Sequence, residues 1–179
     1  GLINKIFKPM SHNFKREKSI IILIGKTFGH LNQSCFLKEN YSIVDGMPPE
    51  VNLLNEKNNG ENVLKLIQEN LVLSSHDVSS GGLIVALSEM AISSNYGAKI
   101  QKPKNLTNLF EYFFGEDQGR YLLEIDPKNL VKSEKILQEN NIYYENIGYT
   151  QNDFFEIEGE LKITVKDLFK LNNEWYNKY

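Results

Sequence analysis

One stretch constrains the fold of this chain more than any other, because it joins the end of a strand to the start of a helix. Residues 73–90 read LSSHDVSSGGLIVALSEM and follow the apolar residues Leu71 and Val72. The polar residues 74–80 are typical of a turn, and the apolar residues after the glycine pair return at helical spacing. Ser79 or Ser80 is predicted to cap this helix, since a serine oxygen accepts hydrogen bonds from the first free amides.

The glycine pair at the helix start has two interpretations. Gly81 and Gly82 leave the first turn without side chains, so a ligand could approach the backbone closely. Free amides and the positive end of the helix dipole favour an anion there, either a phosphate or a carboxylate. Alternatively, the glycines only permit tight packing of the strand on the helix, and Asp77 only caps the turn. The pattern alone leaves both interpretations open.

Strands alternate with helices along the rest of the chain, and a hairpin comes late. The run SIIILI at residues 19–24 is typical of a strand buried on both faces. Asp126-Pro127 is a strong helix start. We expect strands at 19–24, 71–73, 98–100, 121–125, 142–149, 154–157 and 161–164, and helices at 35–37, 50–70, from the glycine pair to about 96, 103–113, 126–140 and 165–179. This order predicts an α+β fold, an α/β sandwich in which helices cover a mixed β-sheet.

Composition narrows the class of protein. A length of 179 residues suits one domain with its own core, and we expect a linker or edge segment at 1–17 followed by a single domain at 18–179. The net charge of −3 provides no basic field for nucleic acid. No apolar run approaches the length of a membrane span. The single cysteine, Cys35, excludes an internal disulfide and fits a reducing compartment, so we expect a cytoplasmic location.

A second polar cluster lies at residues 114–120, FGEDQGR. Glu116 and Asp117 could hold magnesium, and Arg120 could grip a phosphate with two parallel hydrogen bonds. Alternatively, Glu116 and Arg120 pair with each other or cap neighbouring backbone. His76 and Asp77 are adjacent, and adjacent side chains of an extended segment point to opposite faces, so a structural histidine is favoured over an acid–base dyad. No set of residues completes an active site.

Several motifs in one order resemble a known family. They are Leu23-Ile24-Gly25, Gly29-His30-Leu31 with Ser34, Pro48-Pro49-Glu50-Val51, His76-Asp77-Val78-Ser79 with Gly81-Gly82-Leu83, and residues 114–121, FGEDQGRY. Together they resemble the C-terminal domain of the synthetase subunit of phosphoribosylformylglycinamidine synthase, within the aminoimidazole ribonucleotide synthetase-like superfamily. The resemblance covers nearly the whole chain.

The resemblance implies a function for a longer parent protein. The parent would be an ATP-dependent carbon–nitrogen ligase of purine biosynthesis that converts formylglycinamide ribonucleotide and ammonia to the formylglycinamidine. It would use ATP and magnesium, and its partners would be the preceding domains of the same polypeptide, a glutaminase subunit and a small accessory subunit. This part alone is expected to be inactive and to bind neither cofactor, with no catalytic residue and no metal ligand. The candidate ligand-binding residues implied by the matching motifs are His76, Asp77, Ser79, Gly81, Gly82, Glu116, Gly119 and Arg120.

Two other functions stay open at this point. The domain could be a structural or docking domain that stabilises its parent while the glycine loop merely packs. It could also be the equivalent domain of selenophosphate synthetase, thiamine-phosphate kinase or a hydrogenase maturation factor, although the stretch FGEDQGRY argues against these relatives.

Overall fold

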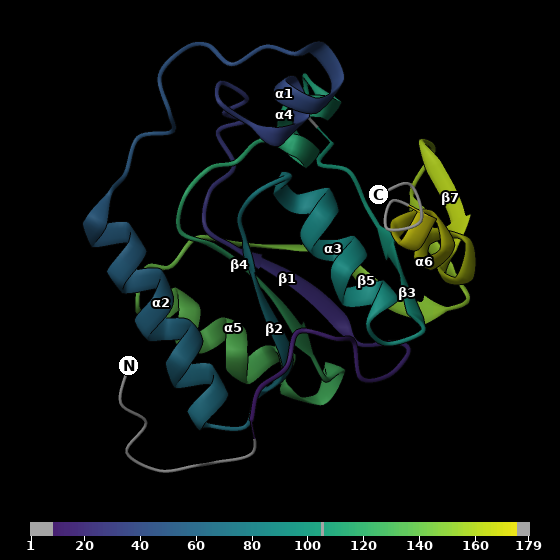
Figure 1. The fold of residues 1–179 in the computed structure, drawn as a ribbon. Coiled ribbons are helices and arrows are strands. Elements are labelled where there is room, and N and C mark those ends of the chain that lie inside the picture. Colours follow the sequence, from purple (N-terminus) through teal and green to yellow (C-terminus); the bar gives the residue numbers. More distant parts are fainter. Residues whose placement is uncertain (1–8, 105, 175–179) are drawn as a thin grey trace.

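The chain folds into one seven-stranded sheet with helices on both faces (Figure 1). This computed structural model describes residues 9–104 and 106–174. The strand order is β2-β4-β1-β5-β3-β6-β7, where β3 and β6 pair in parallel and the other neighbours pair antiparallel. The strands are β1 (Ile20–Ile24), β2 (Val72–Val78), β3 (Tyr96–Ile100), β4 (Arg120–Ile125), β5 (Tyr144–Asn152), β6 (Phe154–Ile157) and β7 (Leu161–Thr164). The prediction of a mixed sheet in an α+β fold is confirmed.

Strand β1 lies at the centre of the sheet between β4 and β5, and it separates two hydrophobic cores. Ile21 and Leu23 pack into one core, whereas Ile22 and Ile24 pack into the other, and all four are 0% exposed. Alternate residues of a strand point to opposite faces, so an apolar residue at every position requires a layer of helices on each side. The burial of this strand on both faces was predicted correctly.

The helices form the two outer layers. Helices α2 (Leu53–Gln68) and α5 (Leu130–Glu139) cover one face, while α3 (Gly82–Ile92), α4 (Leu109–Phe114) and α6 (Val165–Glu174) cover the other (Figure 1). The short helix α1 (Cys35–Tyr41) lies beside α4 at one end of the sheet. Asp126 caps the 3₁₀ turn Pro127–Asn129 before α5, at the helix start predicted there, and Ser34 caps α1. None of the described helices is long and apolar enough to cross a membrane.

The most important correction to the predicted elements concerns β2. Residues 74–78 continue this strand to Val78, although their polarity is typical of a turn. β2 is an edge strand of the described sheet and pairs with β4, and the Ser74 hydroxyl donates a hydrogen bond of 2.8 Å to the buried Glu124 carboxylate. Polar residues are tolerated in this strand because one of its polar side chains finds a buried polar partner.

The predicted serine cap of α3 is wrong. The N-cap is Gly81, in the left-handed conformation with φ +82°, and this residue has no side chain that could cap the helix. The Gly82 amide instead donates to the Ser79 carbonyl at 3.0 Å, so the turn is closed by backbone. Two consecutive residues with positive φ demand glycine, because side chains with a Cβ strain this conformation.

Other element boundaries also differ from the predictions. β3 begins at Tyr96, where a helix end was expected, and α3 stops at Ile92. α4 begins only at Leu109, with Asn108 as its cap. The predicted closing helix at 165–179 corresponds to α6, and its part from Trp175 onward lies outside the described residues.

The described part of the N-terminal segment packs onto the domain. Phe14 is 1% exposed and belongs to the core under α3, and its amide donates to the Met90 carbonyl. The amides of Lys15 and Arg16 donate to the buried carboxylate of Glu124, at 2.9 and 3.3 Å. A boundary between 1–17 and 18–179 remains a prediction, but residues 9–17 lie against the fold and share its core.

Candidate functional site

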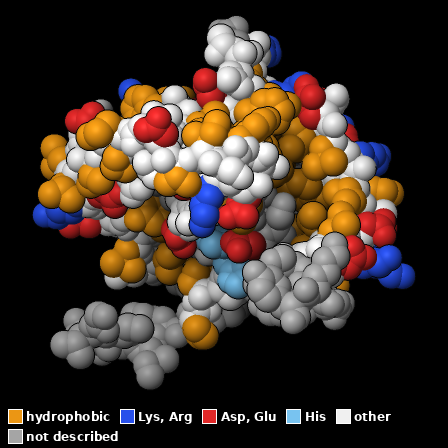
Figure 2. Space-filling model, turned by 45° about the horizontal axis from the view of Figure 1, so that its top comes forward, with side chains coloured by type: hydrophobic (Ala, Val, Ile, Leu, Met, Phe, Trp, Pro, Cys, Tyr) orange, Lys and Arg blue, Asp and Glu red, His pale blue; other side chains and the backbone are white. Residues whose placement is uncertain are grey.

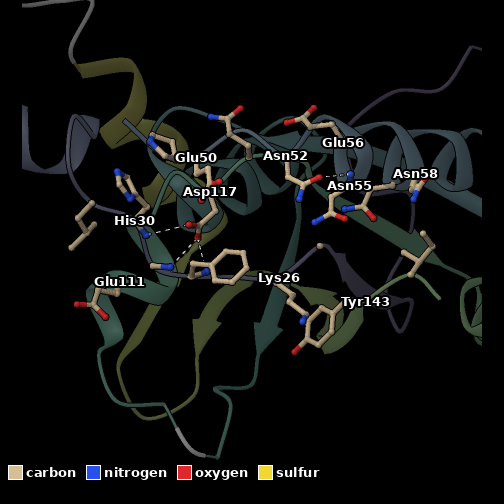
Figure 3. A pocket seen from close by; sticks show the side chains of 18 of the residues that line it. Lys26, His30, Glu50, Asn52, Asn55, Glu56, Asn58, Glu111, Asp117 and Tyr143 are labelled. Carbon is tan, nitrogen blue, oxygen red and sulfur yellow. Dashed lines mark hydrogen bonds between the residues drawn. The ribbon is translucent and has the colours of Figure 1, made fainter. Parts of the chain in front are cut away.

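A large cleft opens at one end of the sheet, where β1 ends and β4 and β5 begin. Its volume is about 1040 Å³, and its walls come from the loop after β1, the first turns of α2 and the residues before β5 (Figure 3). Polar side chains dominate the lining, among them Lys26, His30, Asn52, Asn55, Asn59 and Tyr143. Clefts of this size with a few convergent polar groups are the usual places for small-molecule binding.

Asp117 organises the loop after β1 from within the cleft wall. Its carboxylate accepts hydrogen bonds from the amides of Phe28 and Gly29, both at 2.9 Å, and from the amide of His30 at 3.2 Å (Figure 3). The residue is only 5% exposed. A buried carboxylate that accepts three amides fixes the course of the loop, because each amide would otherwise lose its partner.

Glu116 likewise holds backbone amides, at the start of α3 and the start of α1. Its Oε1 atom accepts hydrogen bonds from the Gly81 amide and the Cys35 amide, both at 2.8 Å. Gly81 is the N-cap of α3, so an internal carboxylate already occupies part of the predicted anion site. The contact also ties the glycine loop before α3 to the start of α1.

Arg120 is enclosed by the same turn, with 1% of its surface exposed. Its guanidinium donates to the carbonyls of Gly115 and Asp117 and to the Thr27 hydroxyl. Burial lowers the pKa of Arg120, and the nearby Asp117 carboxylate, 4.0 Å away, opposes that shift. Of the two interpretations of this residue, the structure agrees with the capping of neighbouring backbone.

Gly119, in the same turn, is hydrogen-bonded to α2, which forms one wall of the cleft. Its φ is +67°, and its carbonyl accepts a hydrogen bond of 2.9 Å from the Asn59 carboxamide on α2.

The glycine pair also has a packing role. A Cβ added at Gly82 would lie 2.7 Å from the Gly115 carbonyl oxygen and 2.7 Å from the Phe114 carbonyl carbon. A Cβ at Gly81 would lie 2.4 Å from a methyl group of Val85. The tight-packing interpretation therefore describes both glycines, since the end of α4 leaves no room for a side chain at the second.

His76, Asp77 and Ser79 stand apart from this buried turn. Nε2 of His76 lies 2.9 Å from the Glu89 carboxylate on α3, and its ring lies 5.2 Å from the ring of His12. Nδ1 of His76 is 3.5 Å from the Asp77 carboxylate, closer than opposite faces of a strand suggest. Asp77 and Ser79 are exposed, so their side chains are free to meet a ligand.

The polar lining of the cleft was not predicted from the sequence. Asn52, Asn55 and Asn59 recur along one face of α2, a helix for which only the apolar face was considered. Their spacing of three and four residues was the available signal, because such residues are neighbours on a helix surface. Lys26 was not singled out from the sequence.

At the wall formed by the residues before β5, Lys26 lies against Tyr143, whose hydroxyl is held by Glu145. Its ammonium group is 5.6 Å from the centre of the Tyr143 ring (Figure 3). The Tyr143 hydroxyl donates to the Glu145 carboxylate at 2.7 Å, and the Tyr112 hydroxyl donates to the same carboxylate at 3.1 Å. The hydrogen bond to Glu145 raises the pKa of Tyr143 to about 12. A lysine above a fixed aromatic ring presents its charge in a defined place.

The arrangement favours binding over catalysis. Carboxamides donate and accept hydrogen bonds, and Lys26 supplies positive charge, so the cleft suits a polar ligand. Within residues 9–104 and 106–174, no three His, Cys, Asp or Glu side chains come together as a metal site. The described residues therefore do not fit a magnesium ion held by this chain alone, and the absence of a metal ligand stays a prediction.

The sequence of this chain matches a known family and several known proteins. The family model for the C-terminal domain of AIR synthase related protein matches residues 17–158. The chain is 44% identical to phosphoribosylformylglycinamidine synthase subunit PurL of Pelagibacter ubique (strain HTCC1062), and 38% identical to the subunit of that name from Rhodopseudomonas palustris (strain HaA2). Both matches cover 100% of this chain and 24% of the relative, so the chain spans about a quarter of their length. The predicted resemblance is confirmed.

Solved structures support the fold. T. maritima PurL complexed with FGAR matches with a TM-score of 0.72 and 17% identity, over 89% of this chain and 29% of that chain. T. maritima PurL complexed with ATP matches with 0.68 and 16%, over 89% and 27%. Thiamine-monophosphate kinase from Stenotrophomonas maltophilia K279a matches with 0.58 and 14%, over 84% and 53%. At such identities the likeness shows a shared fold alone.

Proposed function

This chain belongs to the AIR synthase related proteins, as a member of their C-terminal domain family, and from that membership we propose that it is the C-terminal domain of a phosphoribosylformylglycinamidine synthase subunit. The observation that carries the proposal is the match at 44% identity along all 179 residues to a subunit of that name. The parent converts formylglycinamide ribonucleotide to the formylglycinamidine with ATP, magnesium and ammonia, in the cytoplasm. In this reaction ATP would transfer its terminal phosphoryl group to the amide oxygen, leaving ADP, and ammonia would then displace that oxygen as inorganic phosphate.

This domain contributes two surfaces to the ligand site: the cleft lined by Lys26 and the asparagines at the start of α2, and the β2–α3 loop, whose residues do not line that cleft. Asp77 and Ser79 are exposed beside the helix start and His76 is partly exposed, so we assign direct ligand contact to these three side chains. Gly81, Gly82, Glu116, Gly119 and Arg120 act beneath them by fixing the loops, as their packing and hydrogen bonds indicate. The domain holds no catalytic residue, so alone it is inactive.

The partners follow from the same proposal. The fold is also similar, with a TM-score of 0.66 and 19% identity, to a chain in the solved structure of PurLQS from Thermotoga maritima, an assembly named for more than one component. For this chain we propose the preceding domains of its own polypeptide, a glutaminase subunit that supplies ammonia, and a small accessory subunit.

A chimeric enzyme tests the proposal. This chain replaces the matching 179-residue stretch of the Pelagibacter ubique subunit, and turnover of formylglycinamide ribonucleotide is measured with ATP, magnesium and ammonium. We expect turnover by the chimera and none by the isolated chain. An inactive chimera that folds as stably as the parent would contradict the proposal.

Single substitutions in the chimera test the assignment of ligand contacts. Asp77→Asn and Ser79→Ala change exposed side chains, so we expect a KM for a phosphorylated substrate raised about tenfold and an unchanged melting temperature. Ser80→Ala is the matched control, since Ser80 is an exposed neighbour that we do not assign to ligand contact. Equal KM values in all three variants would show that the β2–α3 loop does not contact the substrate.

A structural or docking role is the second candidate, and one observation favours it. Glu116 already accepts the Gly81 amide, so the helix start is partly satisfied without a ligand. Under this alternative, substitutions in the loop lower the stability of the chimera while the affinity for its substrates stays normal.

A further inference from the structure

The connection between α1 and α2 exposes an unusual run of apolar side chains. We call residues 42–54 the strap; it comprises this connection and the first two residues of α2. Large apolar residues of the strap are between 45% and 77% exposed: Ile43, Val44, Met47, Val51, Leu53 and Leu54. Figure 2 turns the α1–α4 end of the molecule forward and shows hydrophobic side chains spread across the surface there. A concentration of exposed apolar side chains on one segment points to a site of interaction.

The strap is held in place along its inner edge. The His30 ring donates from Nε2 to the Met47 carbonyl at 2.8 Å, and the Gln33 carboxamide donates to the Gly46 carbonyl at 3.0 Å. Gly46 has a φ of +85°, and a Cβ there would lie 2.6 Å from the Asn32 side chain. Polar contacts thus face the domain, and the apolar side chains face outward from a fixed backbone.

The charges around the strap define the chemistry of its partner. Acidic residues outnumber basic ones from residue 38 to residue 57: Glu39, Asp45, Glu50 and Glu56 lie there, whereas Lys38 and Lys57 stand at the two ends. Lys38 pairs with Glu39, and Lys57 pairs with Glu61. Two copies of this surface facing each other around a two-fold axis would bring acidic groups together, which opposes self-association. A complementary partner is apolar at its centre and basic at its rim.

From these observations we infer that the strap is a docking surface for another domain of the same longer polypeptide, one with an apolar face bordered by lysine or arginine. The inference rests on the proposed function in one respect, that the chain is part of a longer subunit; the curated relatives are about four times as long. Pro49, Glu50 and Asn52 of the strap also line the cleft, so the docked domain covers the rim of the cleft.

Hydrogen–deuterium exchange tests this inference. Amide exchange of residues 43–54 is compared between the isolated chain and the chimera with the Pelagibacter ubique subunit. We expect the strap to exchange about tenfold more slowly in the chimera, because docking removes it from solvent. Equal exchange in the two proteins would overturn the inference. A dimeric isolated chain with a protected strap would overturn it too, because a second copy would then be the occupant.

Charge substitutions sharpen the test. Met47→Glu and Leu53→Glu place an acid at side chains that are both 77% exposed, so the isolated chain should keep its stability while the chimera loses strap protection. Val131→Glu is the matched control, since Val131 is 78% exposed on α5 and should leave the strap protected. Strap protection that survives both strap substitutions would refute a docked apolar partner.

The proposed reaction and the proposed docking surface are contradicted by different results. A chimera with a protected strap but no turnover would contradict the proposed reaction and keep the docking surface. A chimera that turns over substrate with a freely exchanging strap would do the reverse.

Discussion

Replacing Asp117 by asparagine is the most direct test of how the cleft wall is built. The carboxylate accepts three amides of the loop after β1, with its Oδ2 atom taking Phe28 and Gly29 and its Oδ1 atom taking His30. Asparagine has nearly the same shape, but it keeps only one acceptor oxygen. If that oxygen retains the first two amides, the new NH₂ group faces the His30 amide, donor against donor.

The size of the effect follows from these contacts. A hydrogen bond to a charged group is worth about 1.5–3 kcal/mol, and one of the three is lost outright. The substitution also removes the negative charge 4.0 Å from the buried Arg120, which still keeps its hydrogen bonds to Gly115, Asp117 and Thr27 through backbone or hydroxyl oxygens. We therefore expect a loss of about 2–4 kcal/mol in the free energy of unfolding. In a chain of this size the melting temperature falls by about 5–15 °C.

Urea unfolding followed by circular dichroism measures this loss. Glu111→Gln is the control, because Glu111 lines the same cleft but is exposed, and we expect it to change stability by less than about 0.5 kcal/mol. If Asp117→Asn costs less than about 1 kcal/mol, the carboxylate does not hold the loop, and its three hydrogen bonds do not carry the stability assigned to them.

Three further predictions concern other parts of the fold. Gly82→Ala should lower the free energy of unfolding by about 2–4 kcal/mol, because its Cβ meets the Gly115 carbonyl at a φ of +72°; a stable alanine variant in urea unfolding would argue against that packing. Phe14→Ala should cost about 3–5 kcal/mol by the same assay, unless residues 9–17 are detached from the core. Tyr143→Phe should remove one phenolate transition near pH 12 from the absorbance titration, because Glu145 raises the pKa of Tyr143 to about 12. Since the raised pKa belongs to the folded state, the stabilisation is present below about pH 10 and is lost as pH rises towards 12; a transition near 10 would refute the contact.

Much of the fold could be predicted because local signals agree with the tertiary structure. The run at residues 19–24 has no polar interruption before Gly25, and only a central strand covered on both faces accommodates it. Ser34 and Asp126 supply caps whose geometry needs only the next few residues. Signals of this kind do not depend on distant parts of the chain.

The failed predictions depended on contacts far along the sequence. The polar residues of β2 fit a strand because Glu124 is buried opposite Ser74, 50 positions away. The N-cap of α3 is a glycine because the backbone there has a positive φ, and Glu116 holds the Gly81 amide from another turn. No local pattern contains this information, so the strand was predicted too short and the cap was placed on the wrong residue.

The candidate site was predicted in part. The motif at 114–120 was singled out from the sequence, and in the structure its acids and Arg120 hold backbone, an alternative that the spacing left open. The cleft itself was missed, because it forms only when the start of α2 meets the loop after β1. Lys26 and the asparagines of α2 are more than 25 positions apart and show no joint pattern.

The adjacent positions of Glu116 and Asp117 have a mechanical consequence. One carboxylate grips the segment before α3 and the start of α1, and the next grips the segment after β1. Because adjacent residues hold the two segments, a displacement of one segment must displace the other. This side of the cleft therefore moves as one rigid unit. Any change in the width of the cleft must then come from α2, which forms another of its walls.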